Sequence, residues 1–124
     1  MQLVQSIDHV VLTVRDIDAA VAFYERLLGV EAVTFAGGRR ALQIGAQKIN
    51  LQTLGQETRN HAAIGCGDLC LVRTLGDAEV LAHLARIGVA VVEGPVAKTG
   101  ATGPISSIYV NDPDGNLIEL ARYT

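Results

Sequence analysis

The sequence lacks tryptophan and has few aromatic residues, with two phenylalanines and three tyrosines among 124 residues. Aromatic side chains are the platforms on which nucleic-acid bases stack, so base stacking is poorly provided for. The chain also has no run of lysine or arginine, and its formal net charge is −3. Because phosphate groups are bound mainly by basic patches, we expect neither nucleic acid nor an anionic membrane as a partner.

The sequence also lacks a long apolar run, since no stretch approaches the roughly 18 residues of a membrane-spanning helix. Its first residues, MQLVQSIDHV, have no basic segment typical of a signal peptide. The only cysteines are Cys66 and Cys70, and on one strand their Cα atoms would lie about 13 Å apart, too far for a disulfide. We therefore expect a cytoplasmic protein with both cysteines reduced and buried as small apolar side chains.

Hydrophobic residues make up 49% of the chain, which is enough for the packed core of one domain over residues 1–124. The chain repeats itself at a constant offset of 59 residues. The segment HVVLTVRDIDAAVAFYERLLGV, from His9, aligns without a gap with DLCLVRTLGDAEVLAHLARIGV, from Asp68. Each copy has an apolar strand, an aspartate, a helical period and a final glycine, and this pattern predicts an internal duplication.

Both copies predict the same order of elements. In each, a strand precedes a helix with one apolar face, which ends at Gly29 in the first copy and Gly88 in the second. Three short strands are then expected, at 31–35, 40–44 and 48–53, and again at 89–93, 105–111 and 116–121. The expected fold is α+β, with two pseudo-symmetric βαβββ modules (about 5–54 and 66–122, with a linker at 55–65) that form a half-barrel cup.

Two segments resemble the vicinal oxygen chelate superfamily: IDHVVLTVRDIDAAVAFYERLLGV near the start and ISSIYVNDPDGNLIEL near the end. That superfamily includes glyoxalase I, fosfomycin-resistance enzymes, extradiol dioxygenases and bleomycin-resistance proteins. The resemblance covers nearly the whole chain and is closest to short, single-domain glyoxalase-like members. It implies a cup, usually dimeric, that holds a divalent metal between its two sheets.

The resemblance also implies four metal ligands on the first and last strands of the modules, namely His9, Gln52, Asp68 and Glu119. The residues themselves agree in part, because the duplication pairs His9 with Asp68 and Gln52 in INLQT aligns with Glu119 in NLIEL. A glutamate in an apolar strand needs a partner, which a metal would supply. The alternatives are that Asp68 only begins a strand and that Glu119 faces solvent. His61, in the linker, is expected to be exposed.

Asp68 departs from the family pattern, which usually has histidine there. One histidine with oxygen donors is a harder ligand set, which favours Mn²⁺, Ni²⁺, Mg²⁺ or Zn²⁺ over iron. This departure weakens the case for an extradiol dioxygenase, which uses two histidines and one carboxylate for Fe(II). It also leaves open a protein that binds no metal.

The segment GPVAKTGATGPISSIYV is the candidate substrate loop, because Lys98 and its glycines lie near Ser107 and Tyr109. It resembles the phosphonate-binding region of fosfomycin-resistance enzymes, and the alternative is a flexible hairpin with an exposed lysine. Strand alternation lets only one of Arg39 and Arg40 point inward. The sequence leaves open which one, and we take Arg40 as the candidate.

The sequence therefore predicts a metal-dependent glyoxalase-like homodimer that acts on a small, oxygen-chelating, anionic substrate. Lyase, isomerase or epoxide-opening chemistry is expected, with Glu119 as the catalytic base. Two alternatives remain. One is a metal-free protein that binds a drug or metabolite, as bleomycin-resistance members do. The other is an extradiol dioxygenase, which would need Fe(II) and an aromatic pocket that five aromatic residues hardly supply.

Overall fold

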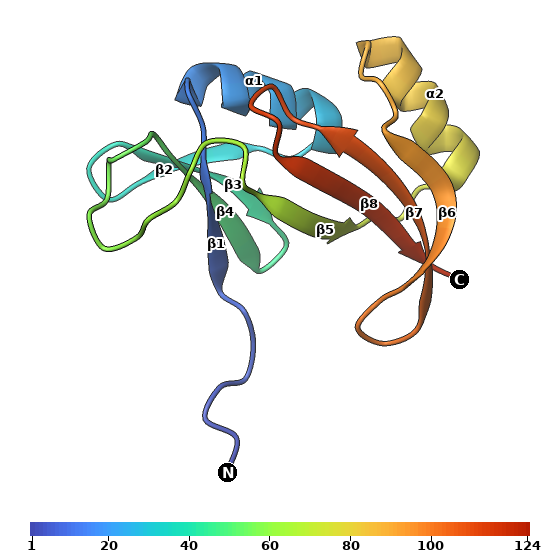
Figure 1. Ribbon diagram of the computed structural model, residues 1–124, viewed down its shortest axis with the longest axis horizontal. Helices are drawn as coiled ribbons and strands as arrows, with labels where there is room; N and C mark the ends of the chain where they lie inside the picture. The colour runs from blue at the N-terminus through green and yellow to red at the C-terminus, as the bar shows by residue number, and fades with distance from the viewer. The chain divides into compact units, whose positions relative to one another are not determined.

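The computed structural model describes residues 1–124 and divides the chain into two compact units, Met1–Ile64 (module 1) and Gly65–Thr124 (module 2). Module 1 consists of β1 (His9–Thr13), α1 (Ile17–Leu28), β2 (Ala32–Phe35), β3 (Arg39–Ile44) and β4 (Gln47–Gln52). Module 2 consists of β5 (Asp68–Val72), α2 (Asp77–Ile87), β6 (Glu93–Thr99), β7 (Pro104–Asn111) and β8 (Leu117–Tyr123). Both modules have the predicted βαβββ order (Figure 1). Neither helix is long and apolar enough to span a membrane.

Each module forms one four-stranded mixed sheet. The strand order is β1-β4-β3-β2 in module 1 and β5-β8-β7-β6 in module 2. The first strand of each module pairs in parallel with the last, and the other pairs are antiparallel. Side chains on β1 therefore lie beside those on β4, and side chains on β5 lie beside those on β8.

The first helix begins and ends where its local sequence predicts. The Asp16 side chain caps the helix by accepting a hydrogen bond of 2.9 Å from the Ala19 amide. Gly29 ends it in the left-handed conformation, with φ of 68°, which glycine adopts without strain. The helix contacts β3 and β4 through a buried face that includes Tyr24. Gly88 ends the second helix in the same way.

One face of each sheet is covered by the module's own helix. In module 1 the buried residues Leu12, Leu42 and Leu51 lie on this face, and in module 2 Ile108 and Ile118 do. Because side chains alternate along a strand, the next residue in each case points to the opposite face. We call that opposite face the distal face, and it carries the candidate site residues of both modules except Arg40.

The strand that follows α2 differs from the prediction. It was expected at 89–93, but β6 spans Glu93–Thr99 and includes half of the segment predicted to be a glycine-rich loop. The pairing with β7 determines the position of β6, because Lys98 pairs with Ile105 and Val96 pairs with Ser107. Pro95 is tolerated because β6 is an edge strand with an irregular register between Glu93 and Val96.

The turn between β7 and β8 lies where the sequence Asp-Pro-Asp-Gly predicts it. One carboxylate oxygen of Asp112 accepts hydrogen bonds of 2.9 Å from the amides of Asp114 and Asn116. The Asn116 side chain, which is fully buried, accepts a 2.7 Å bond from the Gly67 amide. The turn therefore fixes the start of β5, and with it Asp68, against β8.

Candidate functional site

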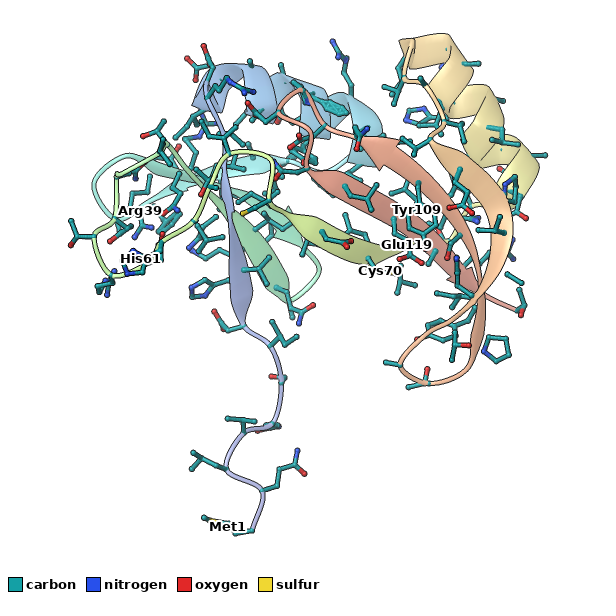
Figure 2. All side chains as sticks on the ribbon, viewed as in Figure 1. Met1, Arg39, His61, Cys70, Tyr109 and Glu119 are labelled. Carbon is teal, nitrogen blue, oxygen red and sulfur yellow. The ribbon has the colours of Figure 1, made fainter.

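Glu119 lies in the middle of β8 on the distal face of module 2. Its register partners are Cys70 on β5 and Tyr109 on β7, so these three side chains form a row across the sheet (Figure 2). The hydroxyl of Ser107, a fully buried residue, donates a hydrogen bond of 2.6 Å to Oε2 of Glu119. A buried hydroxyl thus fixes the orientation of a half-buried carboxylate.

A cavity of about 330 Å³ lies beside this carboxylate, within module 2. Its walls are mostly apolar, and its lining residues are Cys70, Val72, Thr99, Gly100, Ala101, Ile105, Glu119, Ala121 and Tyr123. At Gly100 a Cβ atom would lie 2.7 Å from the Tyr123 hydroxyl oxygen, so a larger residue would displace the Tyr123 side chain. The cavity suits a small, partly apolar molecule with a polar group directed toward Glu119.

The neighbours of Glu119 are held in their protonated forms. Partial desolvation of the sulfur, followed by the charge of Glu119 and a hydrogen bond to it, raises the pKa of the Cys70 thiol. The same causes, in the same order, raise the pKa of the Tyr109 hydroxyl. Both groups therefore stay neutral at physiological pH and face the carboxylate as proton donors. A cation bound at this face would meet one oriented negative charge and no competing thiolate.

Asp68, the first residue of β5, shares the distal face with Glu119. It pairs with Leu117 in the parallel register, two positions before Glu119 on β8. Asp68 is exposed, and its backbone is fixed by the Leu117 amide, which donates 2.8 Å to the carbonyl of Gly67. The structure thus brings two of the four predicted ligands onto one face of one sheet, and both are oxygen donors.

In module 1, His9 begins β1 on the distal face. Its Nδ1 lies 2.8 Å from the Asp8 carboxylate, and its side chain is 44% exposed. The contact with Asp8 engages Nδ1 and leaves Nε2 as the nitrogen available for a metal or a proton transfer. His61 is exposed, as expected.

The other predicted ligand of module 1, Gln52, is engaged within the module. It is 2% exposed, and its Nε2 donates to the Thr13 hydroxyl at 2.8 Å and to Asn60 Oδ1 at 3.2 Å. The strand register also differs from the predicted alignment. Val11 and Cys70 are equivalent positions of the two copies, and Asn50 lies opposite Val11 while Glu119 lies opposite Cys70. Asn50, and not Gln52, is therefore the module 1 counterpart of Glu119.

Asn50 was not among the predicted site residues, and it carries an unusual feature. It is 4% exposed, and its Oδ1 has no hydrogen-bond partner. A buried carbonyl oxygen without a donor is costly, and such atoms are often completed by an ion, a water or a ligand. Only the strand register reveals this residue, because its sequence context, INLQT, draws attention to the glutamine.

The predicted substrate residues lie in different places. Arg40 pairs with Leu51 and so points to the helix-covered face, which leaves Arg39 on the distal face of module 1. On module 2, the Nζ of Lys98 lies 6.0 Å from the centroid of the Tyr109 ring, at the edge strand β6. Ser107 contacts Glu119 and is fully buried, so it supports the carboxylate.

The expected burial of the cysteines is wrong, because both Cys66 and Cys70 are exposed free thiols. Cys66 precedes β5, and Cys70 points to the distal face, where the sheet carries no helix. Exposed and half-buried residues alternate along β5, and Cys70 occupies one of the exposed positions.

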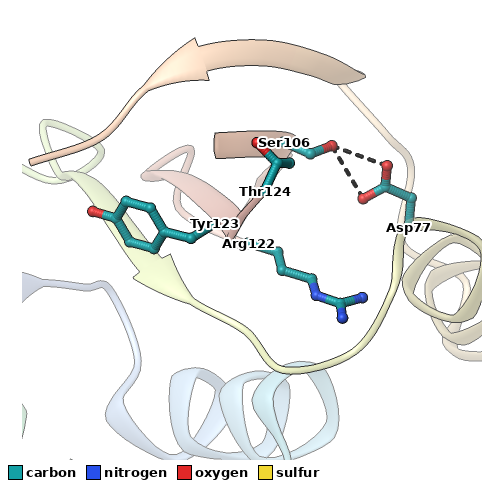
Figure 3. A pocket seen from close by; sticks show the side chains of 5 residues that line it. All are labelled: Asp77, Ser106, Arg122, Tyr123 and Thr124. Atoms are coloured by element: carbon teal, nitrogen blue, oxygen red, sulfur yellow. Dashed lines mark hydrogen bonds between the residues drawn. The ribbon is translucent and has the colours of Figure 1, made fainter. Parts of the chain in front are cut away.

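A second hollow of module 2, of about 400 Å³, is lined by Asp77, Ser106, Arg122, Tyr123 and Thr124 (Figure 3). Ser106 belongs to the helix-covered face of β7. Its hydroxyl donates hydrogen bonds to both carboxylate oxygens of Asp77, at 3.1 and 2.9 Å. These polar groups satisfy one another and join α2 to its sheet, so their role is structural.

Neither module by itself assembles three histidine, cysteine or carboxylate side chains around one point. In module 2 the candidate donors are the carboxylates of Asp68 and Glu119. In module 1 they are His9 and the carbonyl oxygen of Asn50. Carboxylate and amide oxygens are donors that a hard or borderline divalent ion accepts.

The contact between Cys70 and Glu119 gives a testable prediction. In chelator-treated Cys66→Ser protein, alkylation of Cys70 by iodoacetamide should need a higher pH than an ordinary cysteine, because its pKa is raised. Glu119→Gln should move the midpoint to lower pH, since the nearby negative charge is removed. Mass spectrometry of the alkylated fraction across pH measures this. An unchanged midpoint in Glu119→Gln would show that the two groups do not interact.

Comparison with known proteins gives a consistent match. A family model described as the Glyoxalase/Bleomycin resistance protein/Dioxygenase superfamily matches residues 6–120. Virulence protein STM3117 of Salmonella typhimurium is 48% identical over 124 residues, covering 98% of this chain and 86% of the relative. Its crystal structure matches at a TM-score of 0.92 and 47% identity over 99% of this chain and 100% of that one. Glyoxalase domain-containing protein RDO1 of Mycosarcoma maydis is 50% identical over 123 residues, covering 97% and 69%.

More distant solved structures share the fold. Lactoylglutathione lyase from Agrobacterium tumefaciens has a TM-score of 0.75 and 25% identity, covering 94% of this chain and 92% of that chain. The fosfomycin resistance protein FosX from Listeria monocytogenes, solved with Mn(II) and sulfate, has a TM-score of 0.69, covering 98% and 93%. At its 20% identity, the likeness to FosX concerns the fold alone.

Proposed function

This chain belongs to the Glyoxalase/Bleomycin resistance protein/Dioxygenase superfamily, and from that membership we propose that it is a metal-dependent glyoxalase-like enzyme. Its substrate is a small, oxygen-chelating, anionic molecule, and its chemistry is that of a lyase, an isomerase or an epoxide-opening enzyme. One observation carries the proposal: Asp68 and Glu119 share one face of a sheet, and Glu119, oriented by Ser107, lines a cavity of about 330 Å³.

In the proposed site, Asp68 and Glu119 supply oxygen ligands and His9 supplies a nitrogen ligand. Gln52 is buried and its Oε1 accepts a hydrogen bond from Asn60 Nδ2 at 3.4 Å, so water or Asn50 is the better candidate for a fourth ligand. These donors favour Mn²⁺, Ni²⁺, Mg²⁺ or Zn²⁺ over iron. Such an ion supplies Lewis-acid polarisation of two substrate oxygens.

The residues around Glu119 give it the role of the base. Ser107 holds Oε2, so Oε1 is the oxygen that would either hold the ion or, when free of it, take a proton from substrate. Tyr109 and Cys70, both kept protonated, each donate toward the carboxylate, and either could turn its single proton to a developing oxyanion instead. Lys98, exposed at the edge strand, is the candidate of module 2 for contacting an anionic part of the substrate.

The homodimer expected from the sequence is part of this proposal. The two outermost strands of each sheet have one edge with no neighbouring strand. They are β1 and β2 in module 1 and β5 and β6 in module 2. An exposed strand edge pairs readily with a second chain, and β5 also exposes Val72.

Metal loading and a substrate panel test the proposed function together. We expect protein purified without chelator to contain about one divalent ion per chain, and chelator-treated protein to regain activity with Mn²⁺ or Ni²⁺. The panel consists of 2-oxoaldehyde thiohemiacetals, epoxides and catechols, and turnover is expected with one of the first two classes. Ring cleavage of a catechol that requires Fe(II) would instead indicate a dioxygenase. Equal ligand binding with and without metal, and no turnover, would indicate a binding protein.

A further inference from the structure

The strands of module 1 place basic side chains, and no acidic ones, on the distal face. The strands β1, β2, β3 and β4 contain no aspartate or glutamate at all. Their distal positions include Arg39, Lys48 and His9, because Lys48 pairs with His9 and Arg39 pairs with Phe35. The carboxylates that approach these groups, Asp8 and Glu57, come from segments outside the strands. The sheet itself therefore presents positive charge without its own counter-charge.

Phe35 and Glu57 fix the position of Arg39 on this face, but one of its hydrogen-bond donors has no acceptor. Its guanidinium carbon lies 5.2 Å from the centroid of the Phe35 ring, and its Nη2 lies 3.4 Å from Glu57 Oε1. Its Nε is buried and has no hydrogen-bond partner. A guanidinium presents its donors as a rigid fork, so a free Nε–H next to a fixed Nη is half of a site for a two-oxygen anion.

Lys48 approaches the same aromatic ring from β4. Its Nζ lies 3.3 Å from the centroid of Phe35, and the residue is half-buried. The ring face attracts each cation, but two cations over one ring repel each other, and a single carboxylate, Glu57, offsets them. An anion bound at Arg39 beside this ring would offset the excess positive charge and pair the free Nε of Arg39.

We propose that Arg39 and Lys48 form a subsite for a compact oxyanion, a carboxylate, phosphate or phosphonate group of the substrate. Arg39 donates from Nε and one terminal nitrogen to two oxygens of the group, and the ammonium of Lys48 adds charge. Phe35 and Glu57 position Arg39. This subsite deepens the proposed function, and rests on it, by assigning recognition of the anionic group to module 1 in place of Lys98 on module 2.

The test is a calorimetric titration of the full chain with inorganic phosphate, methylphosphonate and acetate as probes, at low ionic strength. We expect saturable binding that weakens with added salt. Arg39→Gln should weaken it by about tenfold or more, and Arg39→Lys, which keeps charge but loses the fork, by less. Lys48→Gln should weaken it severalfold. The three probes distinguish a phosphate-type group from a carboxylate.

Two variants at the same ion pair sharpen the result. Arg59→Gln is the matched control, because Arg59 also contacts Glu57, at 3.0 Å, but is 84% exposed, so it should bind the probes as the unchanged protein does. Glu57→Gln should strengthen binding, since it removes the carboxylate that competes for Arg39. Circular dichroism of each variant confirms folding.

The proposal is overturned if the unchanged protein binds none of the probes, if Arg39→Gln and Arg59→Gln behave alike, or if Lys98→Gln alone abolishes binding. Mn²⁺ binding, followed by electron paramagnetic resonance, separates this failure from that of the proposed function. Loss of probe binding in Arg39→Gln with Mn²⁺ binding retained supports both. Arg39-dependent probe binding in a protein that never binds metal supports the subsite and overturns the proposed function.

Discussion

Replacing Glu119 with glutamine is expected to weaken Mn²⁺ binding by roughly 100-fold and to abolish turnover. The substitution removes one negative oxygen ligand and the proposed base but keeps an amide oxygen that can accept the hydrogen bond of Ser107. The fold should therefore survive. Calorimetric titration with Mn²⁺, Zn²⁺ and Mg²⁺ measures the loss.

The matched control is Glu93→Gln. Glu93 pairs with Tyr109 and so lies across β7 from Glu119, but on the edge strand β6. This change removes the same charge from the same sheet, and metal affinity should change by no more than about twofold. Equal losses in both variants would mean that the sheet attracts cations only through its net charge and has no ligand at Glu119.

Asp68 extends this test, because it is the residue that departs from the family pattern. If Asp68 is a ligand, Asp68→Ala lowers affinity for every metal, and Asp68→His shifts preference toward Fe²⁺ or Zn²⁺, since a neutral nitrogen replaces a charged oxygen. Unchanged affinities in both variants would remove Asp68 from the site and leave water or Asn50 as the third ligand.

The sequence predicts best what short-range interactions determine. Gly29 ends the first helix, as expected. The helix cap at Asp16 and the Asp112–Gly115 turn likewise depend on residues only a few positions apart. The duplication predicts the order of elements for the same reason, because each copy repeats the same local signals. The βαβββ order of both modules follows from these signals alone.

Strand register is where prediction from the sequence was incomplete. The position of β6 depends on its pairing with β7, and the choice between Arg39 and Arg40 depends on which residue lies opposite Leu51. A shift of one residue turns a side chain to the other face, and a shift of two moves it along the same face. That second shift separates Asn50 from Gln52, so the module 1 counterpart of Glu119 appears only once β1 and β4 are paired.

The role of Arg73 could not be predicted from the sequence, because its partners Leu120 and Ser106 are distant along the chain. Its side chain is 8% exposed. It donates hydrogen bonds to the carbonyl oxygens of Leu120 at 3.0 Å, Leu75 at 2.6 Å and Ser106 at 3.1 Å, and it pairs with Asp77. One guanidinium therefore joins β7, β8 and the start of α2.

Arg73→Met is expected to lower the free energy of unfolding by about 3–5 kcal/mol. Methionine fills the space but removes the donor from three carbonyl oxygens and leaves the Asp77 carboxylate with Ser106 alone. Arg59→Met, at a side chain that is 84% exposed, should change it by no more than about 0.5 kcal/mol. Urea unfolding at neutral pH measures both. A loss of about 1 kcal/mol or less in Arg73→Met would mean that water replaces the guanidinium at these carbonyls.

The same substitution should change how stability depends on pH. The hydrogen bonds from Arg73 and then Ser106 lower the pKa of Asp77 in the folded protein. Asp77 therefore adds stability above the pKa of an unfolded aspartate, about 3.9, and this contribution is lost as pH falls through the lower folded value. Arg73→Met removes the main cause of that shift, so its unfolding free energy should fall less steeply below about pH 4 than that of the unchanged protein. If the unfolding free energies of the two proteins decreased equally as the pH fell, the buried arginine would stabilise the module through its carbonyl contacts alone.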